Sequence, residues 1–228
     1  MNLSGPILDH HSMPAAHSHI DPPAGCRLCA RLVEFRKKCA IAEPNWFNGA
    51  VPSFGDSHTA RVLIVGLAPG LQGANKTGRA FTGDQSGELL FATLREFGFL
   101  EGTYGGHSKD GLHLIDTMIT NAVRCVPPAN RPTAAEVNTC RQFLVGSMQS
   151  LSHLQIVVAL GRVAHDSIVT AVGLRKSGNK FAHGARHELG NGHVLFDSYH
   201  CSRYNINTGR LTTSMFHDVF RAVRTELD

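Results

Sequence analysis

The chain has 228 residues, of which 42% are hydrophobic, and 22 Lys and Arg against 18 Asp and Glu give a net charge of +4. This size and composition predict one substantial core and a single domain, and the mild positive charge favours an anionic partner without identifying it. No apolar run is long enough to cross a membrane and no signal-peptide pattern opens the chain, so we expect a cytoplasmic protein without a membrane partner.

Residues 1–24 mix His, Pro, Ala and Ser without periodicity, which predicts a flexible lead before one domain spanning residues 25–228. The histidines of this lead offer an adventitious metal site, although a solvated tail is the simpler interpretation. A helix is expected to begin at the segment Cys26-Arg-Leu-Cys29. Residues 41–58 are predicted to form a loop, with Trp46 as an anchor in the core.

The segment Val62–Val65 is an aliphatic run typical of a buried parallel strand, and it stops at Gly66. A Gly-rich loop follows, and helical periodicity resumes over residues 88–97. Because α/β sheets bind ligands outside the carboxyl ends of their strands, we expect a site in this loop. The loop is also a near match to a P-loop ending in Lys76-Thr77, but a P-loop starts its helix at that pair, and here glycines follow instead. The P-loop is therefore the weaker interpretation.

The rest of the chain alternates strands with helices. Strands are predicted over residues 114–123, 155–160 and 193–198, and helices over residues 133–151, 161–172 and from about 213. A long polar loop, residues 199–210, follows the last strand. This alternation predicts an α/β fold with three layers, α/β/α, around a central, mainly parallel four-stranded sheet.

Six cysteines in a chain without a leader are expected to be thiols or metal ligands, because disulfides belong to oxidising compartments. Four of them form two pairs, one tight and one wide: Cys26 with Cys29, and Cys125 with Cys140. If the fold brings the pairs together, four thiolates suit either a tetrahedral zinc ion or a cubane iron–sulfur cluster. Spacing alone does not choose between these metals, and buried free thiols are the remaining alternative.

Two loops carry a family resemblance. The first contains Gly66-Leu-Ala68-Pro69-Gly70 and Asn75-Lys-Thr-Gly-Arg-Ala-Phe81-Thr-Gly-Asp84-Gln-Ser-Gly87, and the second contains His200-Cys201-Ser202 and continues to residue 212. Together with the four cysteines, they resemble the uracil-DNA glycosylase superfamily, and most of all its iron–sulfur family 5, over about residues 26–220. The family's second motif is His-Pro-Ser, so Cys201 stands here in place of Pro and removes a constraint on φ.

The resemblance implies a uracil-DNA glycosylase-like fold and a structural [4Fe–4S] cluster on the four paired cysteines. It implies hydrolysis of the N-glycosidic bond of uracil in double- or single-stranded DNA, which initiates base excision repair, and it leaves room for other deaminated bases such as hypoxanthine and xanthine. We expect such an enzyme to be a monomer associated with the nucleoid. The alternative is a non-catalytic iron–sulfur or zinc nucleic-acid-binding protein, because the His-Cys-Ser departure is compatible with lost activity.

The chemistry of a glycosylase gives roles to residues in both loops. The nucleotide is flipped out, and the N–C1′ bond breaks through an oxocarbenium-like state while negative charge builds on the base. The resemblance implies that His200 stabilises this charge, that Asn121 reads the base edge and that Phe81 stacks on the base. Asp84 is the candidate to orient water or stabilise the cationic sugar, since the first motif has no other carboxylate. Backbone groups complete the substrate pocket: Gly66, Ala68, Pro69 and Gly70.

Each of these roles has a structural alternative: a strand-end cap for Asn121, a core position for Phe81 and a structural histidine at position 200. The second loop is also the predicted DNA contact. After Ser202, the side chain of Tyr204 is expected to stack in the gap left by the flipped base, and Arg203 to contact phosphate or the orphan base.

Overall fold

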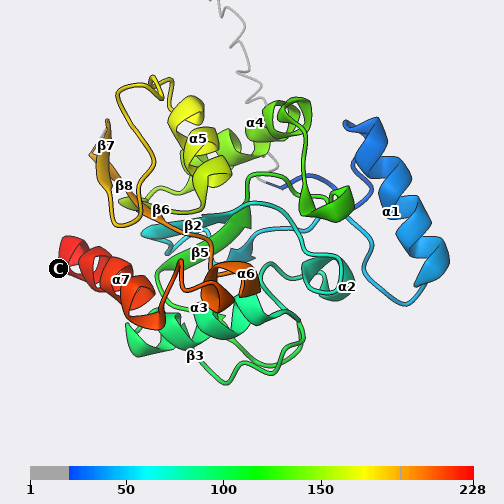
Figure 1. Ribbon diagram of the computed structural model, residues 1–228, viewed down its shortest axis with the longest axis horizontal. Coiled ribbons are helices and arrows are strands. Elements are labelled where there is room, and N and C mark those ends of the chain that lie inside the picture. The colour runs from blue at the N-terminus through cyan, green and yellow to red at the C-terminus, as the bar shows by residue number, and fades with distance from the viewer. Residues whose placement is uncertain (1–20, 191) are drawn as a thin grey trace, which may run out of the picture.

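The computed structural model describes residues 21–190 and 192–228, and its centre is a six-stranded sheet (Figure 1). Its strands are β1 (Phe54–Gly55), β2 (Val62–Gly66), β5 (Thr117–Asn121), β6 (Ile156–Leu160), β7 (Arg186–Gly190) and β8 (His193–Ser198). They lie in the order β1-β5-β2-β6-β8-β7, with the four inner strands parallel and the two edge strands antiparallel. The predicted parallel strands are all present, and the two edge strands widen the sheet beyond the predicted four.

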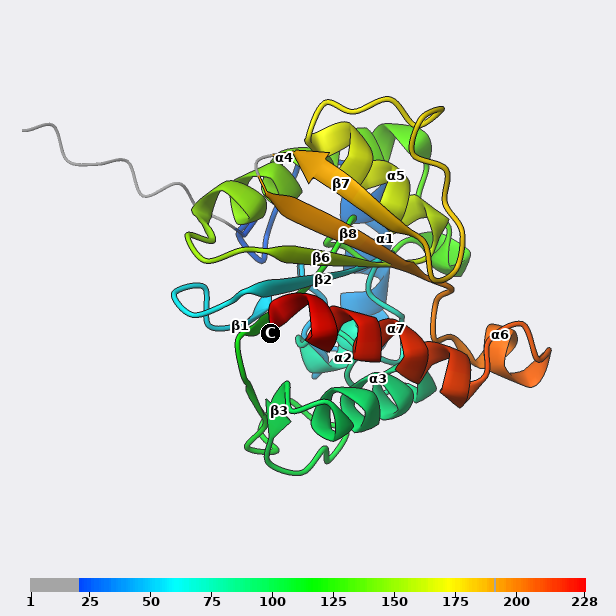
Figure 2. The same cartoon turned by 90° about the vertical axis from the view of Figure 1, so that its left-hand side faces the viewer.

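Helices cover both faces of the sheet (Figure 2). The long helices are α1 (Ala30–Ala42), α3 (Gln85–Glu96), α4 (Ala134–Ser150), α5 (Arg162–Ala171) and α7 (Thr213–Leu227). Helices α3 and α7 lie on one face, and α4 and α5 lie on the other. Among the helices of the described residues, none has both the length and the apolar character of a membrane span. The predicted three-layer arrangement is confirmed.

The strand β2 shows how the sequence produces these layers. Its residues alternate between the faces: Val62 and Ile64 belong to the core under α3 and α7, whereas Leu63 and Val65 belong to the core under α4 and α5. All four are buried. A central parallel strand is covered on both sides, which is why its sequence is an unbroken aliphatic run.

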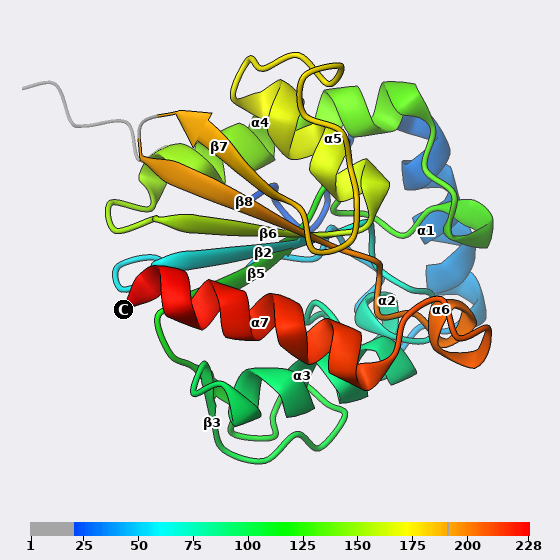
Figure 3. The ribbon, with the colours of Figure 1, turned by 60° about the vertical axis from the view of Figure 1, so that its left-hand side comes forward.

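Besides the edge strands β1 and β7, the sequence patterns did not predict five short elements. They are α2 (Ala74–Thr77), β3 (Leu100–Glu101), β4 (His113–Leu114), the 3₁₀ turn Pro128–Asn130 and α6 (Arg203–Asn207). One helical turn contains too few residues to establish a hydrophobic period. Helices α2 and α6 both lie at the end of the molecule where the parallel strands terminate (Figure 3).

The start of the chain packs onto the domain ahead of the predicted boundary at residue 25. The predicted lead falls mostly on residues 1–20, which lie outside the described residues. The carboxylate of Asp21 binds the guanidinium of Arg124 at 2.6 Å and accepts a hydrogen bond from the hydroxyl of Ser53 at 2.8 Å. The carbonyl of Ala24 accepts a hydrogen bond from the amide of Ala50 at 2.8 Å. Residues 21–24 therefore belong to the folded part.

The prediction that Trp46 anchors the core is wrong. Its side chain is only half-buried and lies outside the three buried clusters. The ring packs instead beneath Lys76, whose ammonium nitrogen lies 5.6 Å from the ring centroid. A large apolar ring next to a flexible cation is stable at a surface, so composition alone does not place a tryptophan inside.

Candidate active site

A pocket opens at the carboxyl ends of β2, β5 and β8, where the two motif loops meet. It is lined by Ala68, Pro69, Gly70, Ala74, Phe81, Asp84, Ser86, Asn121 and His200. All of these except Ala74 and Ser86 are predicted site residues. Loops that are far apart in the sequence are thus brought to one place by parallel strands that end at the same edge of the sheet.

Gly66 lies directly behind the pocket and allows its back wall to close. A Cβ atom at this position would lie 2.4 Å from Oδ1 of Asn121 and 2.6 Å from the ring of Phe81. Both contacts are shorter than van der Waals separation, so a glycine is needed here. Phe81 has a φ of 54°, a left-handed conformation that is uncommon for an aromatic residue. Its ring is held nearly parallel to that of His200, with 5.8 Å between the centroids.

Asn121 is the last residue of β5, and 4% of it is exposed. Among the described residues, no backbone group hydrogen-bonds to its side-chain amide, so the structure gives no support to the strand-end cap. The amide lines the pocket next to Phe81 and His200. A buried amide with free donor and acceptor atoms can bind both a carbonyl and an N–H of a planar base.

Asp84 is both a helix cap and a pocket residue. One carboxylate oxygen, Oδ1, accepts a hydrogen bond from the amide of Gly87 at 3.2 Å and caps α3. The other oxygen, Oδ2, faces the loop of Gly70 and Gly73, where added Cβ atoms would lie 3.1 and 2.5 Å away. The first motif therefore uses glycines to make room for this carboxylate. The cap holds the side chain while leaving Oδ2 available.

His200 follows β8, and the buried Nδ1 atom of its imidazole has no hydrogen-bond partner among the described residues. Burial lowers the pKa of His200, and the nearby Asp84 carboxylate opposes this shift without cancelling it. The imidazole is therefore neutral at pH 7. An unpaired buried polar atom costs about 1–3 kcal/mol, so its presence in a pocket points to a bound partner.

Cys201, which stands where the family has Pro, ties the second loop to the first. Its thiol is fully buried and donates to the carbonyl of Ser86 over 3.4 Å. Burial raises the pKa of this thiol, so it stays protonated and keeps its donor hydrogen. The side-chain amide of Asn205 also restrains the loop, because its Nδ2 atom donates to the backbone carbonyl of His200 at 2.8 Å. These contacts restrain the loop that the absent Pro would otherwise stiffen.

Beneath the first loop lies a fully paired group, the guanidinium of Arg79. Its two terminal nitrogens bind both carboxylate oxygens of Asp110 at 2.7 Å, and Nε donates to the hydroxyl of Thr82 at 2.7 Å. The aromatic rings of Phe54 and Phe91 lie against it at 4.9 and 5.6 Å. These hydrogen bonds hold the pKa of Asp110 well below its usual range. The pair anchors the loop two residues before Phe81.

The mouth of the pocket widens into a groove along the second loop. Ser202 caps α6, Arg203 Nε donates to the side chain of Gln85 at 2.7 Å, and Tyr204 is 71% exposed. Of these three residues, Ser202 lines the groove. Other lining residues were not predicted from the sequence: Ser86, Asn130, Gly161, Arg162 and Val163. Three of these sit where β6 passes into α5, which is the same kind of strand end that revealed the first loop. The rule about carboxyl ends, applied to every strand, would have found them.

The four paired cysteines line one cavity between α1, α4 and the segment after β5. Cys39 and Cys201 do not line it. Within the described chain, no three cysteine sulfurs lie within 4.8 Å of one another. A mononuclear tetrahedral zinc site with Zn–S bonds of about 2.3 Å needs sulfurs roughly 3.8 Å apart. As they lie among the described residues, the four thiols are therefore not preformed as a tetrahedral site for one zinc ion.

The P-loop interpretation is not supported. Lys76 and Thr77 lie inside α2, and the ammonium of Lys76 packs over Trp46 away from the pocket. The hydroxyl of Thr77 is hydrogen-bonded to backbone carbonyls, including that of Thr82 at 3.1 Å. Neither side chain is placed to hold a phosphate or its metal ion.

Comparison with known proteins identifies the family of the chain. The family model described as "Uracil DNA glycosylase superfamily" matches residues 52–224. The Type-5 uracil-DNA glycosylase of Thermus thermophilus is 44% identical over 200 residues, covering 85% of this chain and 90% of that protein. The Type-5 enzymes of Mycobacterium bovis and Pyrobaculum aerophilum are 40% and 39% identical, with 87% and 86% of this chain covered and 77% and 86% of the relatives. The chain therefore belongs to the uracil-DNA glycosylase superfamily and, within it, to the type-5 family.

Proposed function

We propose that this protein hydrolyses the N-glycosidic bond of uracil in DNA and so initiates base excision repair. The observation that carries the proposal is the single pocket in which Phe81, Asp84, Asn121 and His200 converge. Each supplies a different function that the reaction needs: an aromatic face, a carboxylate, a base-reading amide and a neutral imidazole. A non-catalytic binding protein has no need for a carboxylate and an unpaired imidazole in the same buried pocket.

The reaction begins when the flipped uracil enters the pocket. The amide of Asn121 binds its polar edge, and the ring of Phe81 covers one face. As the N1–C1′ bond breaks, the bonding electron pair leaves with uracil, and the neutral imidazole of His200 donates a hydrogen bond to the developing anion. A donor that stays neutral does not have to release a proton to the substrate, which is consistent with the lowered pKa of His200.

Asp84 acts on the sugar side. Its oxygen Oδ2 orients a water molecule towards C1′, the water oxygen forms the new bond, and the carboxylate accepts the released proton. Its negative charge also stabilises the positive charge on the sugar. The cap formed by the other oxygen keeps this geometry fixed throughout the reaction.

The cysteine cavity is proposed to hold a [4Fe–4S] cluster through Cys26, Cys29, Cys125 and Cys140. No three of these sulfurs form a compact group among the described residues, which favours a cubane over one zinc ion. Burial raises the pKa of Cys125 to about 12 and of Cys140 to about 11, so bound metal is needed to keep them as thiolates. Such a group would crosslink α1, α4 and the end of β5. Four irons per chain and no stoichiometric zinc at these cysteines are the expected metal content.

DNA contact is assigned to Ser202, Arg203 and Tyr204 on the second loop, with a monomeric protein acting at the nucleoid in the cytoplasm. The deciding experiment is release of free uracil from a labelled oligonucleotide, with hypoxanthine and xanthine substrates in parallel. Wild-type protein should release uracil, and Asp84→Asn should not do so at a comparable rate. Tight DNA binding without any base release would instead establish the non-catalytic alternative.

A further inference from the structure

Away from the pocket, three side chains that the proposed reaction does not use form a compact buried cluster. They are His165 on α5, His187 on β7 and Asp197 on β8. Nδ1 of His165 lies 2.8 Å from Oδ1 of Asp197, and Nε2 of His187 lies 3.0 Å from Oδ2. The side chains of His165 and Asp197 are fully buried, and that of His187 is 12% exposed.

Hydrogen bonding determines which nitrogen of His165 carries a proton. Its Nε2 atom lies 2.8 Å from the backbone carbonyl of Asn179, which can only accept. Nε2 therefore carries the hydrogen, and Nδ1 is the atom directed at the Asp197 carboxylate. A nitrogen lone pair and a carboxylate oxygen repel at 2.8 Å unless a positive charge lies between them. In the described geometry that charge is a proton, and a zinc ion with bonds of about 2.0 Å would take its place once the two atoms separate to about 3.3 Å.

In the part of the chain that the structure describes, no permanent cation neutralises Asp197. Among the described residues, its only charged partners are the two histidines, and no Lys or Arg pairs with it. The ring of Phe181 lies against His165, 5.7 Å between centroids, and excludes water from that side. A buried carboxylate in such surroundings needs a neutralising positive charge. Of the groups around Asp197 in the described chain, only a protonated imidazole can supply it.

We infer that His165, His187 and Asp197 bind a divalent transition metal, with zinc as the best fit. The ligand atoms are Nδ1 of His165, Nε2 of His187 and a carboxylate oxygen of Asp197, which all lie within 4.8 Å of one another. Two imidazoles and a carboxylate are a zinc-binding set, and the fourth position remains open to water. The hydrogen bond from His165 to the Asn179 carbonyl is the outer contact that orients most metal-binding histidines.

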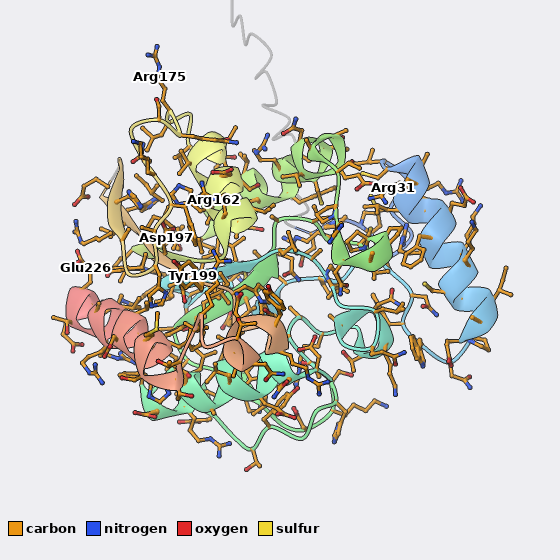
Figure 4. The ribbon with its side chains drawn as sticks, viewed as in Figure 1. Arg31, Arg162, Arg175, Asp197, Tyr199 and Glu226 are labelled. Atoms are coloured by element: carbon orange, nitrogen blue, oxygen red, sulfur yellow. The ribbon has the colours of Figure 1, made fainter. Side chains whose placement is uncertain are left out.

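The ion would clamp the exit of β8. Asp197 also holds the 175–185 loop through its backbone: Gly184 donates to its carbonyl at 2.8 Å, and its amide donates to Ala185 at 2.9 Å. Figure 4 labels Asp197, which lies in β8, and Tyr199, which comes directly after the strand. The metal therefore joins α5, β7, β8 and this loop at a point three residues before His200, without touching the pocket.

The test is the metal content of the full-length chain, with iron and zinc each quantified in the same sample. The parent protein should carry alanine in place of the lead's histidines, His10, His11, His17 and His19, so that these do not contribute. After equilibration with Zn²⁺ and removal of the excess, it should retain one zinc per chain with its iron content unchanged. His187→Gln keeps a donor to Asp197 but is a poor metal ligand, and it should weaken zinc binding by more than about 100-fold, since even outer contacts are worth 10–100-fold.

His193→Ala is the matched control, because His193 lies on β8 outside the cluster, and it should retain zinc like the parent. X-ray absorption at the zinc edge should show nitrogen and oxygen ligands at about 2.0–2.1 Å and no sulfur near 2.3 Å. Thermal unfolding in chelator checks that His187→Gln is folded. Failure of the parent to retain zinc, equal retention by His187→Gln, or a sulfur shell would each overturn the inference and leave a proton between His165 and Asp197.

Discussion

The pocket and the base of the first loop lie within a few residues of each other, but they differ in whether their buried polar atoms have hydrogen-bond partners. Arg79 at the base has partners for its terminal nitrogens and for Nε, whereas the buried Nδ1 atom of His200 in the pocket has none in the part of the chain that the structure describes. Removing one member of a buried ion pair destabilises the fold, because the other member is left as an unpaired buried charge. An unpaired group destabilises the fold until a substrate arrives. The two regions should therefore separate stability from catalysis.

The largest effect is expected at Asp84, the pocket residue that also caps α3. Asp84→Asn keeps an oxygen that can cap α3, so the free energy of unfolding should change little. It removes the charge and the proton acceptor, and single-turnover cleavage should slow by about 10²–10⁴-fold. The loss should be similar for uracil and 5-fluorouracil, because Asp84 acts on the sugar side. Wild-type rates on both bases would make Asp84 a cap alone and contradict the proposed mechanism.

Asp110→Ala tests the paired region. It leaves Arg79 buried without its carboxylate, and unfolding by urea should show a loss of about 3–5 kcal/mol. The folded fraction should still cleave uracil at close to the normal rate. Asp218→Ala is the control, because its pair with Arg221 is exposed and should contribute less than about 1 kcal/mol.

The pH dependence of the same pair has a definite sign. The pKa of Asp110 is lower in the folded than in the unfolded chain, where it is about 3.9. The carboxylate therefore stabilises the fold at pH values above 4, and this contribution declines as the pH falls below 4 towards the folded pKa. The difference in stability between wild type and Asp110→Ala should be full at pH 7 and should shrink in acid. A difference that stays constant down to pH 2 would show that the effect is not electrostatic.

His200→Ala tests the unpaired region. Loss of a donor to the departing base should slow the chemical step by about 2.7–4 kcal/mol, with unchanged or slightly higher stability. The defect should be smaller for 5-fluorouracil, which leaves more easily. For wild type, the rate should not follow protonation of an imidazole between pH 6 and 8, since burial already keeps His200 neutral. A bell-shaped profile centred on the ordinary histidine pKa would argue for a charged imidazole.

Tyr204→Ala should give the smallest effect and should be specific for duplex DNA. The exposed ring is proposed to fill the gap left by the flipped nucleotide, and stacking on a base contributes about 1–3 kcal/mol. Single-stranded substrate needs no unpairing and should be affected less. Equal losses on both substrates would remove Tyr204 from this role.

Much of this architecture can be read from the sequence because the signals are local. The aliphatic run of β2 identifies a buried strand, and Gly66 marks its end. The capping box of Thr133 and Glu136 identifies the start of α4. The pocket could be anticipated because parallel strands end at one edge, which placed Asn121 and the two loops together. The family resemblance supplied the individual roles.

What the sequence did not reveal depends on distant pairs. Arg36 resembles a solvent-facing residue of α1, yet it is buried and donates to the backbone carbonyls of Ala24 and Cys26. Arg162 enters the groove only because β6 lies beside β8. The cluster of His165 and Asp197 joins positions 32 residues apart in the chain. No periodicity encodes such contacts, since they arise after the layers have packed.

The attachment of Asp21 has a practical meaning for anyone shortening this protein. Arg124 is 1% exposed, and Asp21 is the carboxylate that neutralises it next to the cysteine cavity. A truncated version starting at residue 25 would look reasonable from composition, but it would leave the buried guanidinium of Arg124 without its carboxylate partner beside Cys125. The smallest expression fragment worth cloning therefore begins no later than Asp21.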